Sequence, residues 1–415
     1  MKELTKKYKK AQLFVSAECP SDCSYCYIPK SGKSTELNEE IKRGLLNGSY
    51  FENLKKMTRN LESITLMGAE TSCNLDLFAD KIDELKKEFP DLKKITIFSS
   101  IAYPEKVTLF INRCNDFGID VRINASCSGP DFITEEIDKN QIMKEVPDNL
   151  KAVLSNIDKL NIMLTIKWKV TLPFSIIEKM VEDEKKIDRF ISFFEDKKLE
   201  LRSVNSDFNI TIMDDISPDL VKGVDYSAEN GRILAEFIKK AAKKNLFLMK
   251  NSAIKAAINE EAEFSFANCY AGNDSVSIGK MIHPCQWTFL YDRADYFSEA
   301  ANSKKKMETS LVSDSFILEA DDDKGKKRSE YLISTSNEFF KFKINHLKLM
   351  MKEMIDAGQI EKKYMNDNWI GLLLIVGDCF LESLVENKSI HLMNPSYVRL
   401  FCNGALEEMA NIAIS

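Results

Sequence analysis

The stretch ECPSDCSYCYIPK, residues 18–30, places three cysteines, Cys19, Cys23 and Cys26, within eight positions. Ten cysteines among 415 residues would give a C-x3-C-x2-C spacing by chance in about six chains per thousand. The spacing therefore indicates a shared role for the three thiols. Three explanations are open at this point: a metal site, a disulfide framework, or thiols that are buried separately.

Composition and charge exclude several classes of protein. The chain is 44% hydrophobic and 29% charged, and its net charge of −6 gives no electrostatic reason to bind nucleic acid. No apolar segment near the N-terminus resembles a signal peptide, and the longest apolar run, residues 369–377, is too short to cross a membrane. We therefore expect a cytoplasmic protein with no membrane contact, in which thiols stay reduced and disulfides are excluded.

Strand-like and helix-like stretches alternate through the first half of the chain. The predicted strands cover residues 11–17, 63–69, 94–100, 120–126, 160–171 and 199–204. The predicted helices cover residues 39–48, 76–89, 104–117, 174–197 and 229–244. Strands separated by helices predict parallel β/α units, and a small hairpin is expected at 275–285, with Gly279 and Lys280 as its turn.

The three cysteines follow the first predicted strand directly, where parallel β/α folds place their chemistry. Pro20 disfavours a helical conformation at Cys19, and a loop can wrap three thiolates around one metal centre. Iron–sulfur clusters are normally held by four cysteines, so three would leave one iron open to another ligand. A zinc site would need a histidine as its fourth ligand, and the nearest in sequence is His283.

This stretch resembles the radical S-adenosylmethionine (SAM) enzymes, whose signature is C-x3-C-x2-C with an aromatic residue before the last cysteine, here Tyr25. The resemblance implies that Cys19, Cys23 and Cys26 hold a [4Fe–4S] cluster and that SAM binds the fourth iron. It also implies that the reduced cluster cleaves SAM to a 5′-deoxyadenosyl radical, which takes a hydrogen atom from the substrate. A flavodoxin or ferredoxin would be the electron donor.

Two further stretches match this family in the expected order. MGAE, at the end of the second predicted strand, resembles the Gly-Gly-Glu motif, in which the backbone approaches the SAM amino group and the acid accepts its hydrogen bond. Gly68 and Glu70 match that motif, whereas Ala69 replaces the second glycine, which requires a negative φ. Ser99 and Ser100 end the third strand, where the family often has polar groups facing SAM, although an ordinary polar turn is the alternative.

INASCSGPD, residues 123–131, resembles the SLDGP stretch of radical SAM enzymes that modify peptides and proteins. Ser126 stands at the position that reaches the SAM ribose or carboxylate, whereas Ser128 replaces the usual aspartate. The family's HDxxR pattern does not follow, because the chain reads ITEEIDK. Lys167 on the fifth strand is a candidate contact for the SAM carboxylate, with an exposed lysine as the alternative.

Residues 268–285 resemble the start of the auxiliary-cluster domain called SPASM, or of its shorter twitch form. Cys269 and Cys285 are thus candidate ligands of an auxiliary iron–sulfur cluster. The later cysteine block of that domain is missing, and only Cys379 and Cys402 follow, each in an apolar helical pattern. We expect these two to be core thiols and the segment to be a remnant without metal.

Three cysteines lie outside these motifs. Cys114 is predicted to be in the core of a helix, and Cys127 to point away from the cavity at a strand end. Cys73 follows GAET and is a candidate for the cavity edge, where a thiol could give a hydrogen atom to a substrate radical.

These patterns together predict an α/β protein with a partial (β/α)6 TIM-like radical SAM barrel over residues 1–215. A reduced SPASM/twitch-like segment is expected at 216–300 and a mainly helical region at 301–415. The expected activity is radical modification of a peptide or protein, as in the maturation of ribosomally made peptides, with a separate peptide-recognition partner as one option. The alternatives are a small-molecule substrate or a non-catalytic protein that binds an iron–sulfur cluster or SAM.

Overall fold

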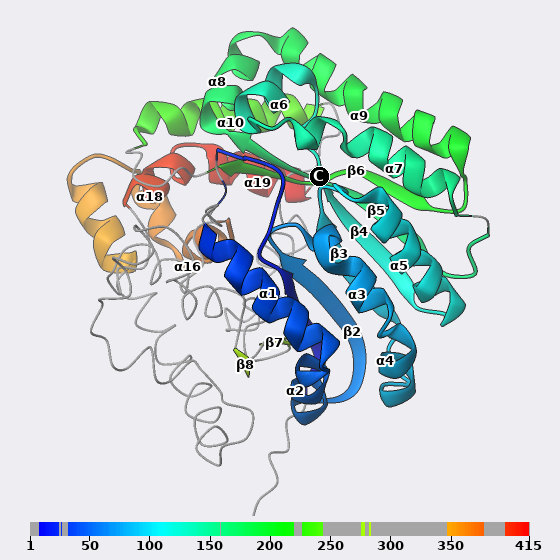
Figure 1. The fold of residues 1–415 in the computed structure, drawn as a ribbon. Helices are drawn as coiled ribbons and strands as arrows, with labels where there is room; N and C mark the ends of the chain where they lie inside the picture. The colour runs from blue at the N-terminus through cyan, green and yellow to red at the C-terminus, as the bar shows by residue number, and fades with distance from the viewer. Residues whose placement is uncertain are drawn as a thin grey trace, which may run out of the picture.

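A computed structural model describes residues 8–24, 26, 32–157, 159–219, 226–243, 275–278, 282–283, 347–376 and 395–414. Its eight-stranded sheet has the order β6-β5-β4-β3-β2-β1-β7-β8 (Figure 1). Strands β1 to β6 pair in parallel with their sequence neighbours, and β7 adds in parallel to the other edge of β1. The strands are β1 (Tyr8–Ser16), β2 (Thr58–Gly68), β3 (Lys94–Ser99), β4 (Asp120–Ser126), β5 (Leu164–Pro173), β6 (Asn209–Asp219), β7 (Ser275–Ile278) and β8 (Ile282–His283).

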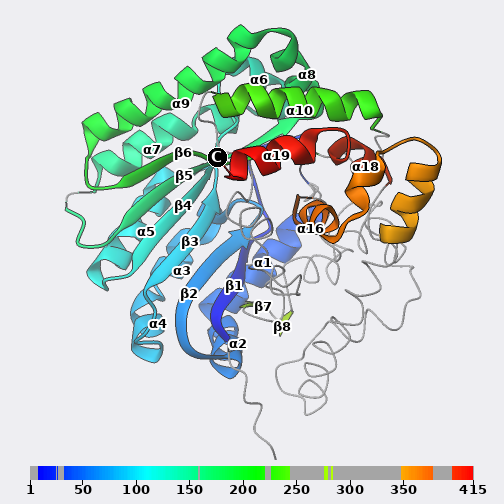
Figure 2. The ribbon, with the colours of Figure 1, turned by 180° about the vertical axis from the view of Figure 1, so that it is seen from behind.

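Helices connect the successive strands and lie on one face of the sheet, as the two opposite views show (Figures 1 and 2). Those between β1 and β4 are α1 (Gly32–Leu46), α2 (Ser49–Met57), the short 3-10 helix η1 (Thr71–Asn74), α3 (Leu75–Ala79), α4 (Ile82–Glu88) and α5 (Pro104–Asp116). Those between β4 and β6 are α6 (Asp131–Ile137), η2 (Ile142–Lys144), α7 (Val146–Ser155), α8 (Phe174–Glu182) and α9 (Glu184–Val204). Within the described part of the chain, no helix is long and apolar enough to cross a membrane.

The two faces of the sheet differ in chemistry, and β5 shows why. Side chains alternate along a strand, and on β5 the apolar members of the alternation are buried. The ring of Trp168 packs against Phe194 of α9, with centroids 5.5 Å apart, so the apolar face is the one that the helices cover. Lys167 and Lys169 belong to the opposite, polar face. The sheet therefore presents polar side chains on the face that those helices leave uncovered.

The α/β class and the first five strands agree with the sequence prediction, but the sixth strand does not. Residues 199–204 form the last turns of α9, and the sixth strand is β6, which begins at Asn209. The buried positions of α9 continue at helical spacing to Leu201, which is 1% exposed, whereas Leu199 is 68% exposed. The helical period thus overrides the local β-propensity of the segment.

Two predicted helices are each divided. Residues 76–89 form α3 and α4. Residues 174–197 form α8 and the start of α9, because Asp183 has extended backbone angles and its side chain accepts a 3.2 Å hydrogen bond from Lys185 N. This is an N-cap, which begins a new helix.

The predicted hairpin at 275–285 is present in β7 and β8, which pair antiparallel with Ser277 opposite His283. Gly279 and Lys280 lie outside the described residues. The parallel pairing of β7 places this hairpin beside β1, the strand that leads into the cysteines.

The described C-terminal residues are mostly helical and contact α10 (Ala228–Lys243). Besides a helix at 347–356 they include η5 (Lys362–Met365), α16 (Asp367–Val376), α18 (Pro395–Phe401) and α19 (Ala405–Ile414). At Gly231 of α10, a Cβ atom would lie 2.7 Å from Asn403 Cβ and 2.8 Å from Leu400 O. The C-terminal segment therefore packs closely on α10 (Figure 2).

Candidate functional site

The predicted site residues lie at the carboxyl ends of four neighbouring strands. Ser16 at the end of β1 pairs with Gly68 at the end of β2, and Ser99 at the end of β3 pairs with Ala125 of β4. The loops that follow these strands start at one edge of the sheet, which is where parallel α/β folds bind their ligands.

The cysteine loop follows β1 and is attached to the segment after α6. Ser24 N donates a 2.8 Å hydrogen bond to Ile137 O, and Cys23 forms an isolated antiparallel bridge with Asp138. Cys26 N donates to Cys23 O at 3.1 Å, which makes a tight turn between these two cysteines. Cys19 and Cys23 are half-buried and Cys26 is exposed. All three cysteines lie on one loop at the site edge of the sheet.

The three cysteines suit an iron–sulfur cluster by residue type and by position. Burial, followed by the charge of Glu70, raises the pKa of the Cys19 thiol to about 12, so a thiolate there needs a positive ion beside it. Among the residues that the structure describes, no three Cys, His, Asp or Glu side chains are already gathered as a metal site requires. Cysteine thiolates are the usual ligands of a [4Fe–4S] cluster, so these three residues fit that group by type, and their thiols would have to come closer together to hold it.

A close approach between β1 and β2 requires glycine at position 68. Gly68 has φ +149°, and a Cβ atom there would lie 2.2 Å from Ser16 O and 2.9 Å from Ser16 N. Ala69 N donates a 2.9 Å hydrogen bond to that same carbonyl oxygen. Ala69 is not among the residues with positive φ, so an alanine can replace the second glycine of the motif at this position.

The buried carboxylate of Glu70 connects the end of β2 to the end of β3. Oε1 accepts a 2.9 Å hydrogen bond from Ser72 N and another from Ser99 Oγ. Oε2 accepts from Ser100 N and Ser100 Oγ, both at 2.6 Å. A carboxylate offers about four acceptor positions, and four donors occupy them. The structure thus brings Glu70 together with Ser99 and Ser100 and gives Glu70 the role of organising the strand ends, whereas SAM contacts of these residues stay a prediction.

The residue after this cluster has an uncommon backbone conformation. Ile101 has φ +55° although its side chain is β-branched, and it is fully buried. Such a conformation costs on the order of 1–3 kcal/mol. Both Ser99 and Ser100 bind Glu70, and Ile101 N donates to Ser99 Oγ at 2.8 Å, so the surrounding hydrogen bonds fix the turn.

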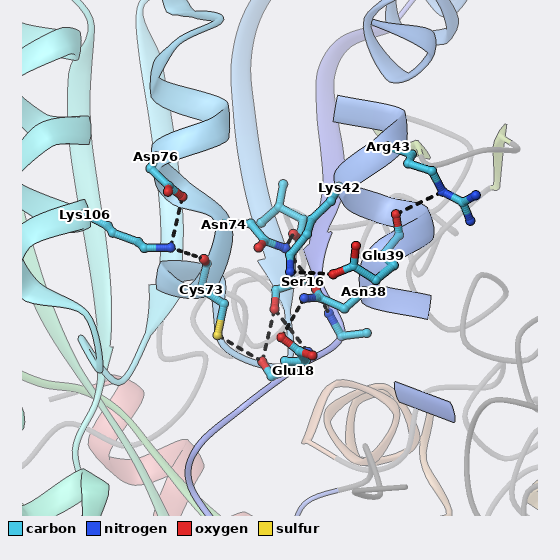
Figure 3. Close-up of polar contacts among 12 residues, drawn as sticks. Ser16, Glu18, Asn38, Glu39, Lys42, Arg43, Cys73, Asn74, Asp76 and Lys106 are labelled. Carbon is cyan, nitrogen blue, oxygen red and sulfur yellow. Dashed lines mark hydrogen bonds and ion pairs between the residues drawn. The ribbon is translucent and has the colours of Figure 1, made fainter. Parts of the chain in front are cut away.

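Two buried asparagines fix the end of β1 just before Cys19 (Figure 3). Asn74 Nδ2 donates to Val15 O at 2.8 Å and to Asn38 Oδ1 at 2.9 Å. Asn38 Oδ1 also accepts from Ala17 N at 3.1 Å, and its Nδ2 donates to Glu18 Oε2 at 2.7 Å. The sequence analysis missed both asparagines. The only sequence signal for Asn38 was its place next to the apolar stripe of α1.

Cys73 lies beside the strand that leads into the cysteine loop (Figure 3). Its Sγ lies 3.5 Å from Glu18 O, the carbonyl before Cys19, and the residue is half-buried. Lys106 Nζ donates to Cys73 O at 2.6 Å and fixes the backbone there. Cys73 therefore stands at the edge of the site, and its role as a hydrogen-atom donor stays a prediction.

On the opposite side of the site, the strand register puts Lys169 next to Ser126. Lys167, the predicted contact for the SAM carboxylate, pairs with Asn124, two residues farther from the carboxyl end of the sheet. Both lysines lie on the polar face of β5. The alternation of polar and apolar residues along that strand could therefore have identified Lys169 as a second candidate.

Several basic side chains lie on β3, β4 and β5, of which Lys169 is nearest to the site edge and Lys94 is at the opposite end of its strand. Burial, followed by the charges of Lys167 and Arg122, lowers the pKa of Lys169 to about 8. Burial, followed by the charge of Arg122, also lowers the pKa of Lys167 and of Lys94 on β3. These basic side chains on β3, β4 and β5 thus lie close enough to raise one another's cost of protonation.

The other cysteines are core residues where the structure describes them. Cys114 and Cys127 are buried, as predicted, and burial raises the pKa of Cys127 to about 12. Cys402 is buried as well. Several predicted residues lie outside the described part of the chain: Tyr25, Cys269, Cys285 and Cys379.

Comparison with known proteins agrees with this geometry. A family model described as a 4Fe-4S single cluster domain matches residues 9–143, which include the cysteine loop and the ends of β1 to β4. The solved structure of native anSMEcpe with bound AdoMet and the Cp18Cys peptide matches with 13% identity and a TM-score of 0.53. The match covers 98% of this chain and 99% of that one. The chain shares the overall fold of that structure.

Two further solved structures match with lower TM-scores. Native anSMEcpe with bound AdoMet, without the peptide, gives 13% identity and a TM-score of 0.50 over 98% of this chain and 97% of that one. SuiB of Streptococcus suis bound to S-adenosylmethionine gives 13% identity and a TM-score of 0.40 over 68% of this chain and 59% of that one. Comparison with curated protein sequences gives no match.

Proposed function

We propose that this protein is a radical SAM enzyme that modifies a peptide or protein. A [4Fe–4S] cluster held by Cys19, Cys23 and Cys26 would supply the electron that cleaves SAM to a 5′-deoxyadenosyl radical. The observation that carries the proposal is the meeting of the cysteine loop, Gly68 and Glu70 at one edge of a radical SAM fold. The fold likeness extends over nearly the whole of a structure described with AdoMet and a peptide, which supports a peptide substrate.

The residues around the proposed SAM site have separate tasks. Gly68 lets the backbone of β2 approach β1 at Ser16, just before the cysteine loop. The Glu70 carboxylate fixes the β3 end and gives the site negative charge, which suits the amino group of SAM. Ser126 and Lys169 form a register pair on the other side, where a protonated amine suits a carboxylate.

The finer architecture is part of the same proposal. The six consecutive parallel strands, the last of which ends at Asp219, would form the partial (β/α)6 barrel predicted for residues 1–215. A SPASM/twitch-like segment would follow up to residue 300, and a helical region over 301–415. A flavodoxin or ferredoxin would deliver the electron, a separate partner could present the peptide, and the enzyme would act in the cytoplasm. Cys269 and Cys285 are the candidate ligands of an auxiliary cluster.

The auxiliary cluster has its own test. Changing Cys19, Cys23 and Cys26 together to alanine removes the ligands of the first cluster, so any iron that remains after anaerobic reconstitution reports a second one. Near-zero iron would support a segment without metal, as the sequence favours. About four irons per chain, lost when Cys269 and Cys285 are also changed, would establish the auxiliary cluster.

The function is tested with protein reconstituted anaerobically with iron and sulfide. With SAM and a strong reductant, the wild-type protein is expected to form 5′-deoxyadenosine, and Cys23→Ala to form none. Cys114→Ala is the matched control, because Cys114 is buried in α5 away from the loop and its loss should leave the product unchanged. Zinc in place of iron, or no 5′-deoxyadenosine, would overturn the proposal.

The substrate class needs a second measurement. Peptides encoded by short reading frames beside the gene are added, and 5′-deoxyadenosine formation and the peptide mass are followed. Faster cleavage with a change in peptide mass would support peptide modification. Stimulation by the low-molecular-weight fraction of a cell extract, with none by peptides, would favour a small-molecule substrate instead.

A further inference from the structure

A fully buried carboxylate, Asp138, connects the cysteine loop to the segment after α6. Its Oδ1 accepts hydrogen bonds from Asp22 N at 2.7 Å and from Asn140 N at 3.2 Å. Its Oδ2 accepts from Met143 N at 3.0 Å. Asp22 lies between Cys19 and Cys23 in the loop, whereas the other two donors belong to the turn that follows Asp138 itself. The carboxylate therefore binds two segments that lie 116 residues apart in the sequence.

Backbone contacts reinforce this connection on both sides of Asp138. Ser24 N donates to Ile137 O at 2.8 Å, and Lys139 N donates to Asp22 O at 3.3 Å. The side chain of Asn140 adds a 2.7 Å hydrogen bond to Pro20 O. The loop is thus bound at several points between Cys19 and Cys26, all by residues 137–140.

The turn after Asp138 also reaches a proposed ligand directly. Met143, whose backbone binds Asp138, has its Sδ 4.0 Å from Cys23 Sγ. Ser128 Oγ lies 2.9 Å from the same Sδ, so the thioether lies between the cysteine loop and the end of β4. A change at Asp138 should therefore be felt at Cys23 through both the backbone and this side chain.

The physical cost of this arrangement argues for a specific use. A buried carboxylate is costly unless charge-assisted hydrogen bonds compensate its lost hydration, and here three N–H groups do so. A surface residue would suffice merely to end α6. The carboxylate instead holds Asp22 N, a donor in the loop that carries the three thiols.

We propose that Asp138 is a positioning residue for the cluster: its carboxylate fixes the backbone of residues 20–24 so that Cys19 and Cys23 can close on the iron. The inference rests on the proposed function, because it takes Cys19, Cys23 and Cys26 as the cluster ligands. Asp138 touches neither SAM nor substrate in this role. By fixing the loop before the cluster binds, Asp138 reduces the entropy that the loop loses when the cluster binds.

Three variants separate the parts of this role. Asp138→Ala removes both acceptor oxygens and leaves Asp22 N, Asn140 N and Met143 N without their partner. Asp138→Asn has nearly the same size but only one acceptor oxygen, so it keeps the bonds of either Oδ1 or Oδ2 and not both. Asp131→Ala is the matched control, since Asp131 lies in the first turn of α6 and forms only a surface ion pair with Lys144 at 3.1 Å.

The measurement is the rate at which an iron chelator removes iron from anaerobically reconstituted protein, with the melting temperature of each apoprotein measured alongside. We expect iron loss about tenfold faster in Asp138→Ala, an intermediate rate in Asp138→Asn, and the wild-type rate in Asp131→Ala. We also record the electron paramagnetic resonance spectrum of the reduced cluster, whose shape reports ligand geometry. The spectrum of Asp138→Asn should be closer to that of the wild type than the spectrum of Asp138→Ala.

The outcomes distinguish this inference from the proposed function. Wild-type iron-loss rates and spectra in both Asp138 variants would overturn the positioning role and leave the cluster intact. Wild-type protein that takes up no iron would overturn the cluster, and the inference with it. If Asp138→Ala does not fold, Asp138→Asn decides: faster iron loss with an unchanged apoprotein melting temperature supports the inference, and an unchanged rate overturns it.

Discussion

The ends of β1–β3 and the ends of β4–β5 border one site but carry opposite charge. At β1–β3 the carboxylates of Glu18 and Glu70 are held by asparagine side chains, serine side chains and backbone N–H groups. At β4–β5, Lys169 lies beside the end residue Ser126, with Lys167 and Arg122 farther from that end, and burial lowers the pKa of both lysines. One side is acidic and fixed by hydrogen bonds, and the other is basic.

This difference teaches how one edge of a sheet can orient a small zwitterion. The amino acid part of SAM has an amino group and a carboxylate on the same carbon atom. For SAM bound as proposed, an acidic border on one side and a basic border on the other would favour a single orientation of that pair, because each charged group is attracted to the border of opposite charge. The predictions below test this contrast, beginning with the change of largest effect.

Loss of any one of Cys19, Cys23 or Cys26 would remove a ligand of the proposed [4Fe–4S] cluster, which would lie between the acidic and the basic side of the site. Each alanine variant is expected to abolish 5′-deoxyadenosine formation and to lower the bound iron strongly, because three ligands already leave one iron open. Iron content and product by chromatography are the measurements. Cys127→Ala, a buried thiol at the end of β4, should keep its iron, and a variant of the triplet that retains full turnover would contradict the proposed cluster.

On the acidic side, Gly68→Ala should destabilise the fold by at least about 2 kcal/mol, because the new Cβ meets Ser16 O and φ is positive. Urea unfolding of the apoprotein measures this. Gly118→Ala is the matched control: Gly118 also has positive φ, +63°, but nothing lies within 4 Å of its Cβ position, so its cost should be about 1 kcal/mol. Equal costs at the two sites would show that the contact with β1 is unimportant.

Glu70→Gln tests the charge of the acidic side. An amide has one acceptor oxygen, so its NH2 group must face either Ser72 N or Ser100 N, and we expect a loss of about 1–3 kcal/mol in stability. SAM affinity should fall about tenfold, as the negative charge near the amino group is lost. Equilibrium binding of SAM to the reconstituted protein is the measurement. Glu84→Gln on the surface of α4 is the control, and unchanged SAM affinity in Glu70→Gln would remove the acidic border from the site.

The smallest effect is expected on the basic side, from Lys169→Met. The pKa of Lys169 is about 8 in the folded protein and about 10.5 when unfolded, so its buried charge lowers stability most below pH 8. Between these values the folded protein binds fewer protons than the unfolded chain, and wild-type stability rises with pH. Because the side chain is partly solvated, we expect Lys169→Met to stabilise the apoprotein by about 1–2 kcal/mol near neutral pH, with the gain shrinking as pH rises above 8.

Urea unfolding at two pH values, on either side of 8, checks this sign. Lys167→Met is the comparison, because Lys167 lies farther from the strand end and should affect SAM affinity less than Lys169. A larger loss of SAM affinity in Lys167→Met would restore Lys167 as the carboxylate contact that the sequence motif suggested.

Local motifs explain what the sequence could predict. The cysteine triplet, Gly68 and Glu70 each follow a predicted strand directly, and the ends of parallel strands meet at one edge. A pattern within a few residues therefore locates them. The sixth strand was misplaced for the opposite reason, because residues 199–204 have a strand-like composition but continue the buried stripe of α9.

The missed residues depend on partners that are distant in the sequence. Asn38 and Asn74 are recognisable only once α1 and η1 are packed against the end of β1. Asp138 looks like an ordinary helix-end acid until its hydrogen bond to Asp22 is seen. Lys169 differs from Lys167 only through the register of β5 on β4. No local pattern contains that information, since the contacts exist only in the folded chain.

The pairing of β7 with β1 has a consequence for synthesis of the chain. Residues 10–13 pair with residues 275–278, which leave the ribosome about 260 residues later. At translation rates of roughly 5–20 residues per second, the edge of β1 that pairs with β7 is without that strand for roughly 10–50 s during synthesis. During that time the strand that leads into the cysteine loop can join other exposed edges, so expression at lower concentration or with chaperones should raise the yield of folded protein.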